Sequence, residues 1–180
     1  EGIFSSVQGV GHFGLQSFGI NPRGAMDRTA ARIANILVGN DEGVNVLEMH
    51  FPAAEIEFDA VCRFALAGAD FTASLDGRHL ANWCLHFAKP GQVLRFEEKL
   101  VGNRAYLAVE GGFEPDEVSA FSTIRIEKED RLRTIKSAST LSAADRTVSV
   151  SKSVLPAYSS FPKVRILPGG EFGSLSEVGR

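Results

Sequence analysis

The sequence predicts a mainly β domain, either a barrel or a sandwich, with one principal amphipathic helix. From residue 44 onward, short apolar segments are separated by turn signals at intervals of roughly ten residues, which is typical of antiparallel β folds. The segment near residues 27–38 instead repeats its apolar residues with a helical period. A chain of 180 residues suits one domain, or one domain and the start of another.

The composition is that of a globular protein without a strong electrostatic signature. Apolar residues make up 44% of the chain, charged residues 23%, and the net charge is −3. Basic residues are scattered, so nothing points to nucleic acid or an anionic membrane as a partner. No apolar run approaches the roughly 20 residues of a membrane span, and no signal-peptide pattern opens the chain. We therefore expect a soluble, cytoplasmic protein.

The cysteines and histidines do not suggest a metal centre. Two cysteines are too few for the disulfide framework of a secreted domain, and Cys62, within an apolar run, is expected to be a buried, inert thiol. The histidines do not fall at metal-ligand spacings, so we expect surface or satisfied core residues, with no metal bound. These residues are Cys62, Cys84, His12, His50, His79 and His86.

Residues 1–24 combine six glycines with interspersed hydrophobic residues. This pattern predicts a short strand followed by a tight, well-packed loop, because glycine allows backbone angles that other residues resist. Residues 9–14 have the form Gly-x-Gly-x-x-Gly, but no βαβ pattern surrounds them, so structural turns are favoured over a phosphate-binding loop. No Walker lysine motif appears, so the chain is not expected to bind ATP by a P-loop.

The helix is the strongest local prediction. Asp27 can cap its first N–H groups, and Gly39 and Asn40 can end it. Between them, the apolar residues follow the spacing i, i+3, i+4 and i+7 at Ala30, Ile33, Ala34 and Leu37.

The following segments predict strands and turns. Asp76-Gly77 is a strong type I′ hairpin signal, and Pro90-Gly91 marks another turn. Two segments, 92–98 and 104–110, are expected to pair with each other across Val101-Gly102-Asn103. The predicted strands are 44–50, 54–59, 61–67, 71–75, 79 onward, 92–98 and 104–110. Beyond them, the charged run 127–133 predicts a solvated turn, and 164–167 a final strand.

Two acidic residues stand at positions where a ligand site is possible. Asp27 lies at the start of the helix, where the backbone dipole also favours anions, and a simple capping role is the alternative. Asp70 follows a buried strand, where it either initiates a turn or orients a polar ligand at the rim of a barrel. Ser122 and Thr123 could be nucleophiles in principle, but no Gly-x-Ser-x-Gly elbow is present.

An ordered series of short motifs resembles one known family. The motifs are Ser6-Val7-Gln8, Gly14, Gly19, Gly24-Ala25-Met26-Asp27, Ala34-Asn35, Leu37-Val38-Gly39-Asn40, Leu47-Glu48, Ala67-Gly68-Ala69-Asp70, Leu75-Asp76-Gly77 and Arg104 through Gly112. In this order they resemble the allophanate hydrolase subunit 2 family. The same family is also named after one of the 5-oxoprolinase subunits, or as the biotin-dependent carboxyltransferase family, which is related to urea amidolyase. The resemblance covers about residues 3–123.

The resemblance implies a cyclophilin-like β-barrel and a second, related lobe. Residues 1–155 would form the N-terminal lobe. Residues 156–180 would be a linker and the start of the second lobe, apparently truncated, with Val164 to Gly169 as its entry.

The resemblance also implies a function. Members act with companion subunits in the ATP-dependent hydrolysis of 5-oxoproline, a small amide, to glutamate, and this hydrolase role is the expectation here, with ATP used by the complex. Fused relatives are the carboxyltransferase part of urea carboxylase, and biotin is implied only under that alternative. The expected catalytic residues are Asp27, Glu48, Asp70 and Arg104, and the expected substrate-binding residues are His12, Met26, Tyr106, Ser122 and Thr123.

The sequence departs from the family pattern at two places. Gly9 stands where the family has an aspartate, and His12 stands where it has an arginine. In the family, that aspartate and arginine could form an ion pair or a substrate clamp, which this chain lacks. After Thr123, the chain continues into Ile124 to Glu129 in place of a glycine-rich loop. A non-catalytic, regulatory or binding subunit is therefore a further alternative.

Overall fold

A computed structural model of the chain describes residues 4–9, 11, 14–114, 124–135, 148–159, 161, 167 and 169–170. Its helices are the 3-10 helix η1 (Gln16–Phe18) and the α-helix α1 (Arg28–Val38). Its strands are β1 (Ser5–Gln8), β2 (Val46–Met49), β3 (Ile56–Glu57), β4 (Cys62–Asp70), β5 (Ala73–Leu75), β6 (Arg78–His79), β7 (Cys84–Ala88), β8 (Val93–Phe96), β9 (Val101–Val109) and β10 (Ile124–Arg125).

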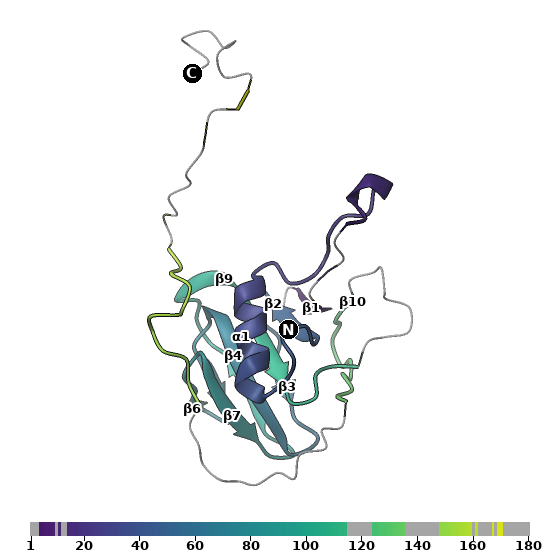
Figure 1. Ribbon diagram of the computed structural model, residues 1–180. Helices are drawn as coiled ribbons and strands as arrows, with labels where there is room; N and C mark the ends of the chain where they lie inside the picture. The colour runs from purple at the N-terminus through teal and green to yellow at the C-terminus, as the bar shows by residue number, and fades with distance from the viewer. Residues whose placement is uncertain are drawn as a thin grey trace.

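The strands form two antiparallel sheets. Six of them make one sheet in the order β10-β1-β2-β9-β4-β7, and four make a second in the order β3-β8-β5-β6. Helix α1 lies across the larger sheet, mainly over β9 and β4 (Figure 1). The prediction of a mainly β fold with one principal helix is confirmed. The closed barrel is wrong for the described residues, because the strands of the smaller sheet pair with one another instead of closing the larger sheet.

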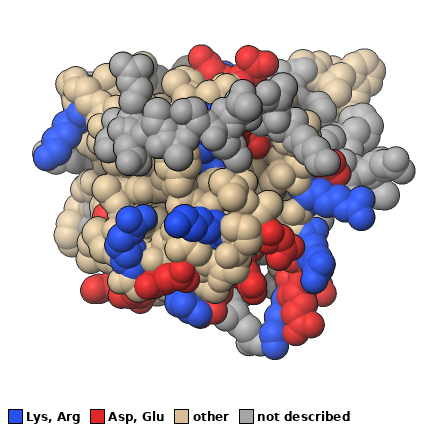
Figure 2. Space-filling model, turned by 90° about the horizontal axis from the view of Figure 1, so that it is seen from below, with Lys and Arg blue, Asp and Glu red and all other residues tan. Residues whose placement is uncertain are grey.

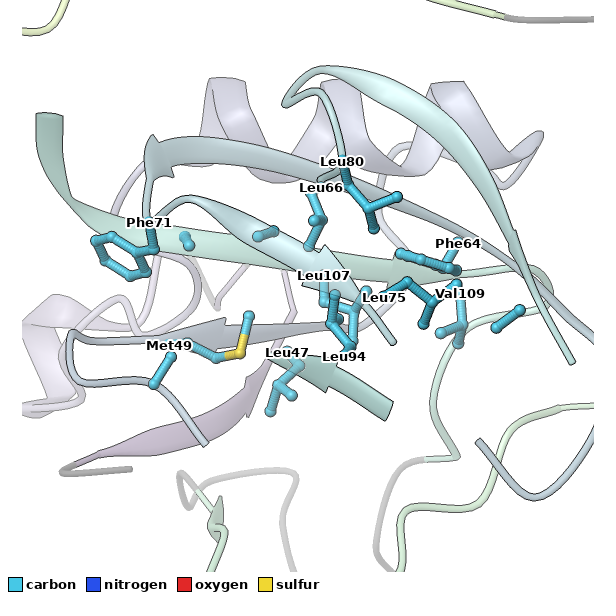
Figure 3. Close-up of a cluster of buried hydrophobic side chains, with 14 of the residues drawn as sticks. Leu47, Met49, Phe64, Leu66, Phe71, Leu75, Leu80, Leu94, Leu107 and Val109 are labelled. Atoms are coloured by element: carbon cyan, nitrogen blue, oxygen red, sulfur yellow. The ribbon is translucent and has the colours of Figure 1, made fainter. Parts of the chain in front are cut away.

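The larger sheet is covered on both faces, and its side chains alternate between two apolar clusters. On the β9 strand, Tyr106 and Ala108 pack with the helix, whereas Leu107 and Val109 pack toward the smaller sheet. Figure 3 shows the second cluster, with side chains from the larger sheet meeting those of β5 and β8. Its labelled members are Leu47, Met49, Phe64, Leu66, Phe71, Leu75, Leu80, Leu94, Leu107 and Val109.

Helix α1 forms as the sequence predicts. Asp27 caps it, with Oδ1 accepting a hydrogen bond of 3.0 Å from the Ala30 N–H, and Gly39 ends it in the left-handed conformation. The buried side of the helix is rich in alanine, and so is the sheet beneath it. The buried alanines of this interface are Ala30, Ala31 and Ala34 on the helix and Ala65, Ala67 and Ala108 on the sheet. Small residues on both sides allow the helix to lie close to the strands.

The predicted pairing of segments 92–98 and 104–110 is wrong. The first segment contains β8, which pairs with β3 and β5, whereas β9 pairs with β2 and β4. The expected turn residues belong to β9 itself. Gly102 has a φ of 81°, and a Cβ there would lie 2.8 Å from the Cβ of Ala69. This glycine therefore permits the close approach of β4 and β9 next to a register shift, and it does not mark a hairpin. The Asp76-Gly77 hairpin is confirmed, with both residues at positive φ.

The loop before the helix is not well packed, contrary to the prediction. Helix η1 stands away from the sheets at the end of an extended loop (Figure 1). Phe18, within it, is 79% exposed. Hydrogen bonds from Phe18, Gly19 and Ile20 to Leu15 or Gln16 close this loop locally.

The outer parts of the chain agree only partly with the predictions. Residues 127–133 form a largely exposed turn, as predicted. The predicted strand 164–167 falls mainly outside the described residues.

Within the described part of the chain, no helix is both long and apolar enough to cross a membrane. On the face seen in Figure 2, acidic and basic side chains are interspersed without a large patch of one sign.

Gly68 provides a test of this packing. It has a φ of 84°, and a Cβ there would lie 2.4 Å from the carbonyl oxygen of Arg104. We expect Gly68→Ala to lower the free energy of unfolding by roughly 3 kcal/mol, from backbone strain and overpacking together. Gly77→Ala is the matched control, because Gly77 has a similar φ of 77° but open space around it. Gly77→Ala should lower the free energy of unfolding by only about 1 kcal/mol. Equal losses in urea unfolding would contradict the packing described here.

Candidate functional site

Polar side chains gather where the start of α1 meets the larger sheet. Glu48 on β2 lies directly opposite Tyr106 on β9. Continuing the same register places His50 opposite Arg104. Because side chains alternate along a strand, these four residues lie on the helix-facing side of the sheet. We call Glu48, His50, Arg104 and Tyr106 the polar cluster.

Glu48 is the buried centre of the polar cluster, with only 6% of the residue exposed. Its Oε2 accepts hydrogen bonds from the Tyr106 hydroxyl at 2.8 Å and from the Met26 N–H at 2.9 Å. Its Oε1 lies 3.3 Å from Nε of Arg104. The Arg104 Nε–H does not make a hydrogen bond of good geometry, so this contact is an ion pair. The carboxylate is thus compensated by one cation and two donors, as a buried charge requires.

Arg104 also reaches His50. Its Nη1 lies 3.0 Å from Nδ1 of His50, and the arginine side chain is 23% exposed. Burial, followed by the nearby Arg104 cation, lowers the pKa of His50 below its usual value. A neutral imidazole can accept the arginine proton at Nδ1, which places its own proton on Nε2. Phe4 packs edge-on against the ring, at 5.2 Å between centroids.

The hydrogen bonds continue from Tyr106 to the helix cap. The Tyr106 hydroxyl accepts from the Asp27 N–H at 2.7 Å while it donates to Glu48. Burial, with the neighbouring Glu48 and Asp27 charges, raises the pKa of Tyr106 far above its usual value, so the hydroxyl stays protonated. The Asp27 carboxylate has two partners of its own. Oδ1 caps the helix, and Oδ2 accepts from the Tyr158 hydroxyl at 2.6 Å.

Five of the nine predicted site residues come together at this place. Glu48, Arg104 and Tyr106 belong to the polar cluster, and Met26 and Asp27 contact it through their N–H groups. The Met26 side chain is 73% exposed beside them. Whether these residues act in catalysis or binding remains a prediction.

Asp70 does not join the polar cluster. Its Oδ1 accepts a hydrogen bond of 2.9 Å from the Thr72 N–H, as expected of an aspartate that initiates a turn. The other three predicted residues, His12, Ser122 and Thr123, lie outside the described residues.

Sequence reasoning missed two residues that contact this site. His50 was expected to be an ordinary surface or core histidine, although its spacing of two from Glu48 would put both on one face of a strand. Tyr158 gave no signal, because it lies 131 positions from Asp27 and outside any regular element.

The described residues do not form a metal site. In the ranges that the structure describes, no three potential ligands among His, Cys, Asp and Glu are grouped as a metal would require. Cys62 is half-buried on β4, and burial raises the pKa of its thiol to about 11, which disfavours the reactive thiolate. Two surface hollows have volumes of about 10 Å³ each. Such hollows are far too small for a nucleotide or biotin, since ligand pockets typically measure about 300 to 1,000 Å³.

Gly9 lines one of these hollows, together with Arg28 and Arg32 of the helix. A Cβ at Gly9 would lie 2.8 Å from Oδ1 of Asn45, the mobile end of a side chain. The backbone can therefore accept the aspartate of the family pattern at this position once Asn45 moves slightly.

Comparison with known proteins shows the family of this chain. A family model described as the carboxyltransferase domain, subdomain A and B, matches residues 18–180. The chain belongs to this family. The resemblance seen in the sequence is confirmed, and all members of the polar cluster lie within the matched residues of the carboxyltransferase domain.

Named relatives of this carboxyltransferase domain fall into two groups. The chain is 40% identical over 114 residues to a 5-oxoprolinase subunit from Escherichia coli, covering 63% of this chain and 36% of the relative. It is 35% identical over 109 residues to the corresponding 5-oxoprolinase subunit from Haemophilus influenzae, covering 61% and 35%. The structure resembles the K. lactis urea amidolyase with a TM-score of 0.76 and 27% identity, covering 88% of this chain and 11% of that one. The chain thus spans about a third of the length of these curated bacterial relatives.

The buried charge of Glu48 leads to a stability prediction for the carboxyltransferase domain. Glu48→Gln leaves Arg104 without its anion in a largely buried place. We expect the free energy of unfolding to fall by about 2 to 3 kcal/mol, less than for a fully buried pair because Arg104 is partly exposed. Urea unfolding at pH 7 measures this loss. The control is Glu55→Gln, which breaks the exposed pair with Arg95 at 3.1 Å and should cost at most about 0.5 kcal/mol. A similar loss in both variants would refute the compensation described here.

The His50–Arg104 contact leads to a pH prediction. Because the pKa of folded His50 lies below its usual value of 6.5, the unfolded chain takes up the proton first as the pH falls. The contribution of His50 to stability is therefore complete above about pH 6.5 and is lost as the pH falls through the folded pKa.

An NMR titration tests the cause of this shift. We expect Arg104→Gln to raise the pKa of His50, since it removes a cation and leaves the Glu48 carboxylate. His86 is the internal control, because its pKa is lowered mainly by burial and also by Arg78. An unchanged His50 titration in the variant would show that Arg104 does not act on the imidazole.

Proposed function

We propose that this chain is part of a subunit of an ATP-dependent 5-oxoprolinase, a hydrolase that opens the lactam of 5-oxoproline to give glutamate. The observation that carries the proposal is the identity of 35% to 40% with two proteins named as 5-oxoprolinase subunits. Companion subunits are the expected partners, because the names of those relatives describe parts of a larger enzyme. The activity of the whole protein is part of the proposal.

The polar cluster supports this proposal chemically. Opening a lactam places negative charge on the carbonyl oxygen, and preorganised donors stabilise that charge. The Arg104 guanidinium is held on one side by Glu48 and on the other by His50, so its direction is fixed before a substrate arrives. The Arg104 side chain is 23% exposed, and its guanidinium is the donor that we assign to the substrate.

The roles of the remaining residues follow from their contacts. Glu48 would orient Arg104, because both of its oxygens are already engaged and it is poorly placed to accept a substrate proton. Asp27 would fix the start of the helix, and the exposed Met26 side chain would contact the substrate. ATP is assigned to the complex, because the sequence of this chain carries no Walker lysine motif.

A second candidate function is that of a carboxyltransferase lobe of the urea amidolyase type. It is favoured by the structural similarity to the K. lactis urea amidolyase, which covers 88% of this chain. This reaction moves a carboxyl group from carboxybiotin to urea and also develops charge on carbonyl oxygens, so the same arginine would serve. Biotin would be carried by another part of the protein.

Reconstitution distinguishes the two candidates. The full-length protein containing this chain is combined with its companion subunits, and ATP turnover is measured with and without 5-oxoproline. We expect turnover that depends on 5-oxoproline, and Arg104→Lys should lower kcat about 100-fold, because a lysine cannot reproduce the fixed, forked geometry. Arg95→Lys is the matched control; it changes an exposed Arg–Glu pair and should leave kcat unchanged.

Two outcomes would count against the first proposal. One is the absence of any 5-oxoproline-dependent turnover by the complete complex. The other is carboxyl transfer from carboxybiotin to urea by the same preparation, which would favour the second candidate.

A further inference from the structure

Residues 148–159 cross the edge of the larger sheet and return to the start of helix α1. We call them the strap. The strap lies along β7: the Leu85 N–H donates to the Val148 carbonyl at 2.9 Å, and the Val150 N–H donates to the Trp83 carbonyl at 3.2 Å. Cys84 and Ser149 form a bridge between these contacts. Figure 1 shows the strap as a yellow-green segment beside β7.

The end of the strap is fixed by two contacts of different kinds. The Tyr158 ring stacks on Trp83, with 6.3 Å between centroids and 19° between planes. The Tyr158 hydroxyl donates a hydrogen bond of 2.6 Å to Oδ2 of Asp27. A short bond from a neutral hydroxyl to a carboxylate is stronger than a bond between neutral groups. Both partners are half-buried, so competition by water is reduced.

The Asp27 contact continues into the polar cluster without a break. The Asp27 carboxylate accepts a hydrogen bond from the Tyr158 hydroxyl, and the Asp27 backbone N–H donates a hydrogen bond to the Tyr106 hydroxyl. The adjacent Met26 N–H donates to Glu48. The strap is therefore linked to Glu48 by consecutive hydrogen bonds, although the two are far apart in the sequence.

We propose that Tyr158 is a positioning residue: by holding the Asp27 carboxylate, the strap fixes the Met26-Asp27 turn whose N–H groups orient Tyr106 and Glu48. Helix capping alone does not explain the contact, since Oδ1 of Asp27 caps the helix and Oδ2 is left for the strap. Loss of the strap leaves Oδ2 without this donor and frees the turn to move. The inference concerns the geometry of the polar cluster and holds whichever reaction the protein performs.

Intrinsic fluorescence tests whether the strap is docked in solution. Trp83 is the single tryptophan of the chain, so its emission reports directly on the Tyr158 contact. We expect Tyr158→Ala to shift the emission to longer wavelength and to increase quenching by acrylamide about twofold or more, because the indole gains contact with water. Val154→Ala, at a strap residue that is 62% exposed, is the matched control and should behave as the unaltered chain. Identical quenching of the unaltered chain and Tyr158→Ala would overturn the proposal.

Amide hydrogen exchange tests the positioning role. Tyr158→Phe keeps the aromatic ring and removes only the donor to Asp27. We expect exchange at the Met26 and Asp27 amides to accelerate about tenfold, as expected for the loss of one hydrogen bond to a charged group. The amide of Leu107, in the central strand β9, should be unaffected. Equal acceleration at all three amides would show a general loss of stability, and no acceleration at Met26 and Asp27 would show that the strap does not hold the turn; either result overturns the proposal.

Discussion

The carboxylate of Glu48 is buried between helix and sheet, and the surrounding structure has to compensate its charge. Transfer of an ion of this size from water costs several kcal/mol, so its partners are constrained in position as well as in kind. Tyr106 must lie opposite it, the turn before α1 must direct an N–H toward it, and Arg104 must approach from two positions before Tyr106 on β9. The need to compensate the Glu48 charge thus constrains both the register of two strands and the start of the helix. In this chain, the residues that stabilise the fold and those proposed to bind the substrate are therefore largely the same.

The local elements could be predicted from the sequence because their signals are local. The cap at Asp27, the stop at Gly39 and the Asp76-Gly77 hairpin depend on residues a few positions apart, and all three appear as expected. Strand pairing depends on which segments share a face in three dimensions. For this reason the sequence predicts that β8 and β9 pair with each other, although they belong to different sheets. Gly102 gave a turn signal, yet it serves a close approach between strands.

The candidate site was predictable to a similar extent. The family resemblance predicts Glu48, Arg104 and Tyr106 as site residues, and the structure brings them into contact. The sequence does not indicate His50, because a single histidine carries no spacing signal and its neighbour across the sheet depends on the strand register. Both the residue pattern and the resemblance predict Asp70 as a site residue, whereas its contacts are those of a turn. Motif membership thus indicates candidate residues, and the structure shows which of them lie together.

The alanine-lined contact between α1 and the sheet has a consequence for how this protein can change over time. Six alanines from the two surfaces pack in one buried cluster, so a larger residue on either surface would overpack it. A larger side chain on the helix would have to be accompanied by a smaller one on a strand, and Ala65, Ala67 and Ala108 are already near the lower limit of size. Substitutions that enlarge a side chain are therefore expected on the exposed face of the helix and in the outlying loops, and not in this interface. The distance between helix and sheet is therefore expected to stay constant as the sequence diverges. The position of any reactive group at the start of the helix depends on that distance.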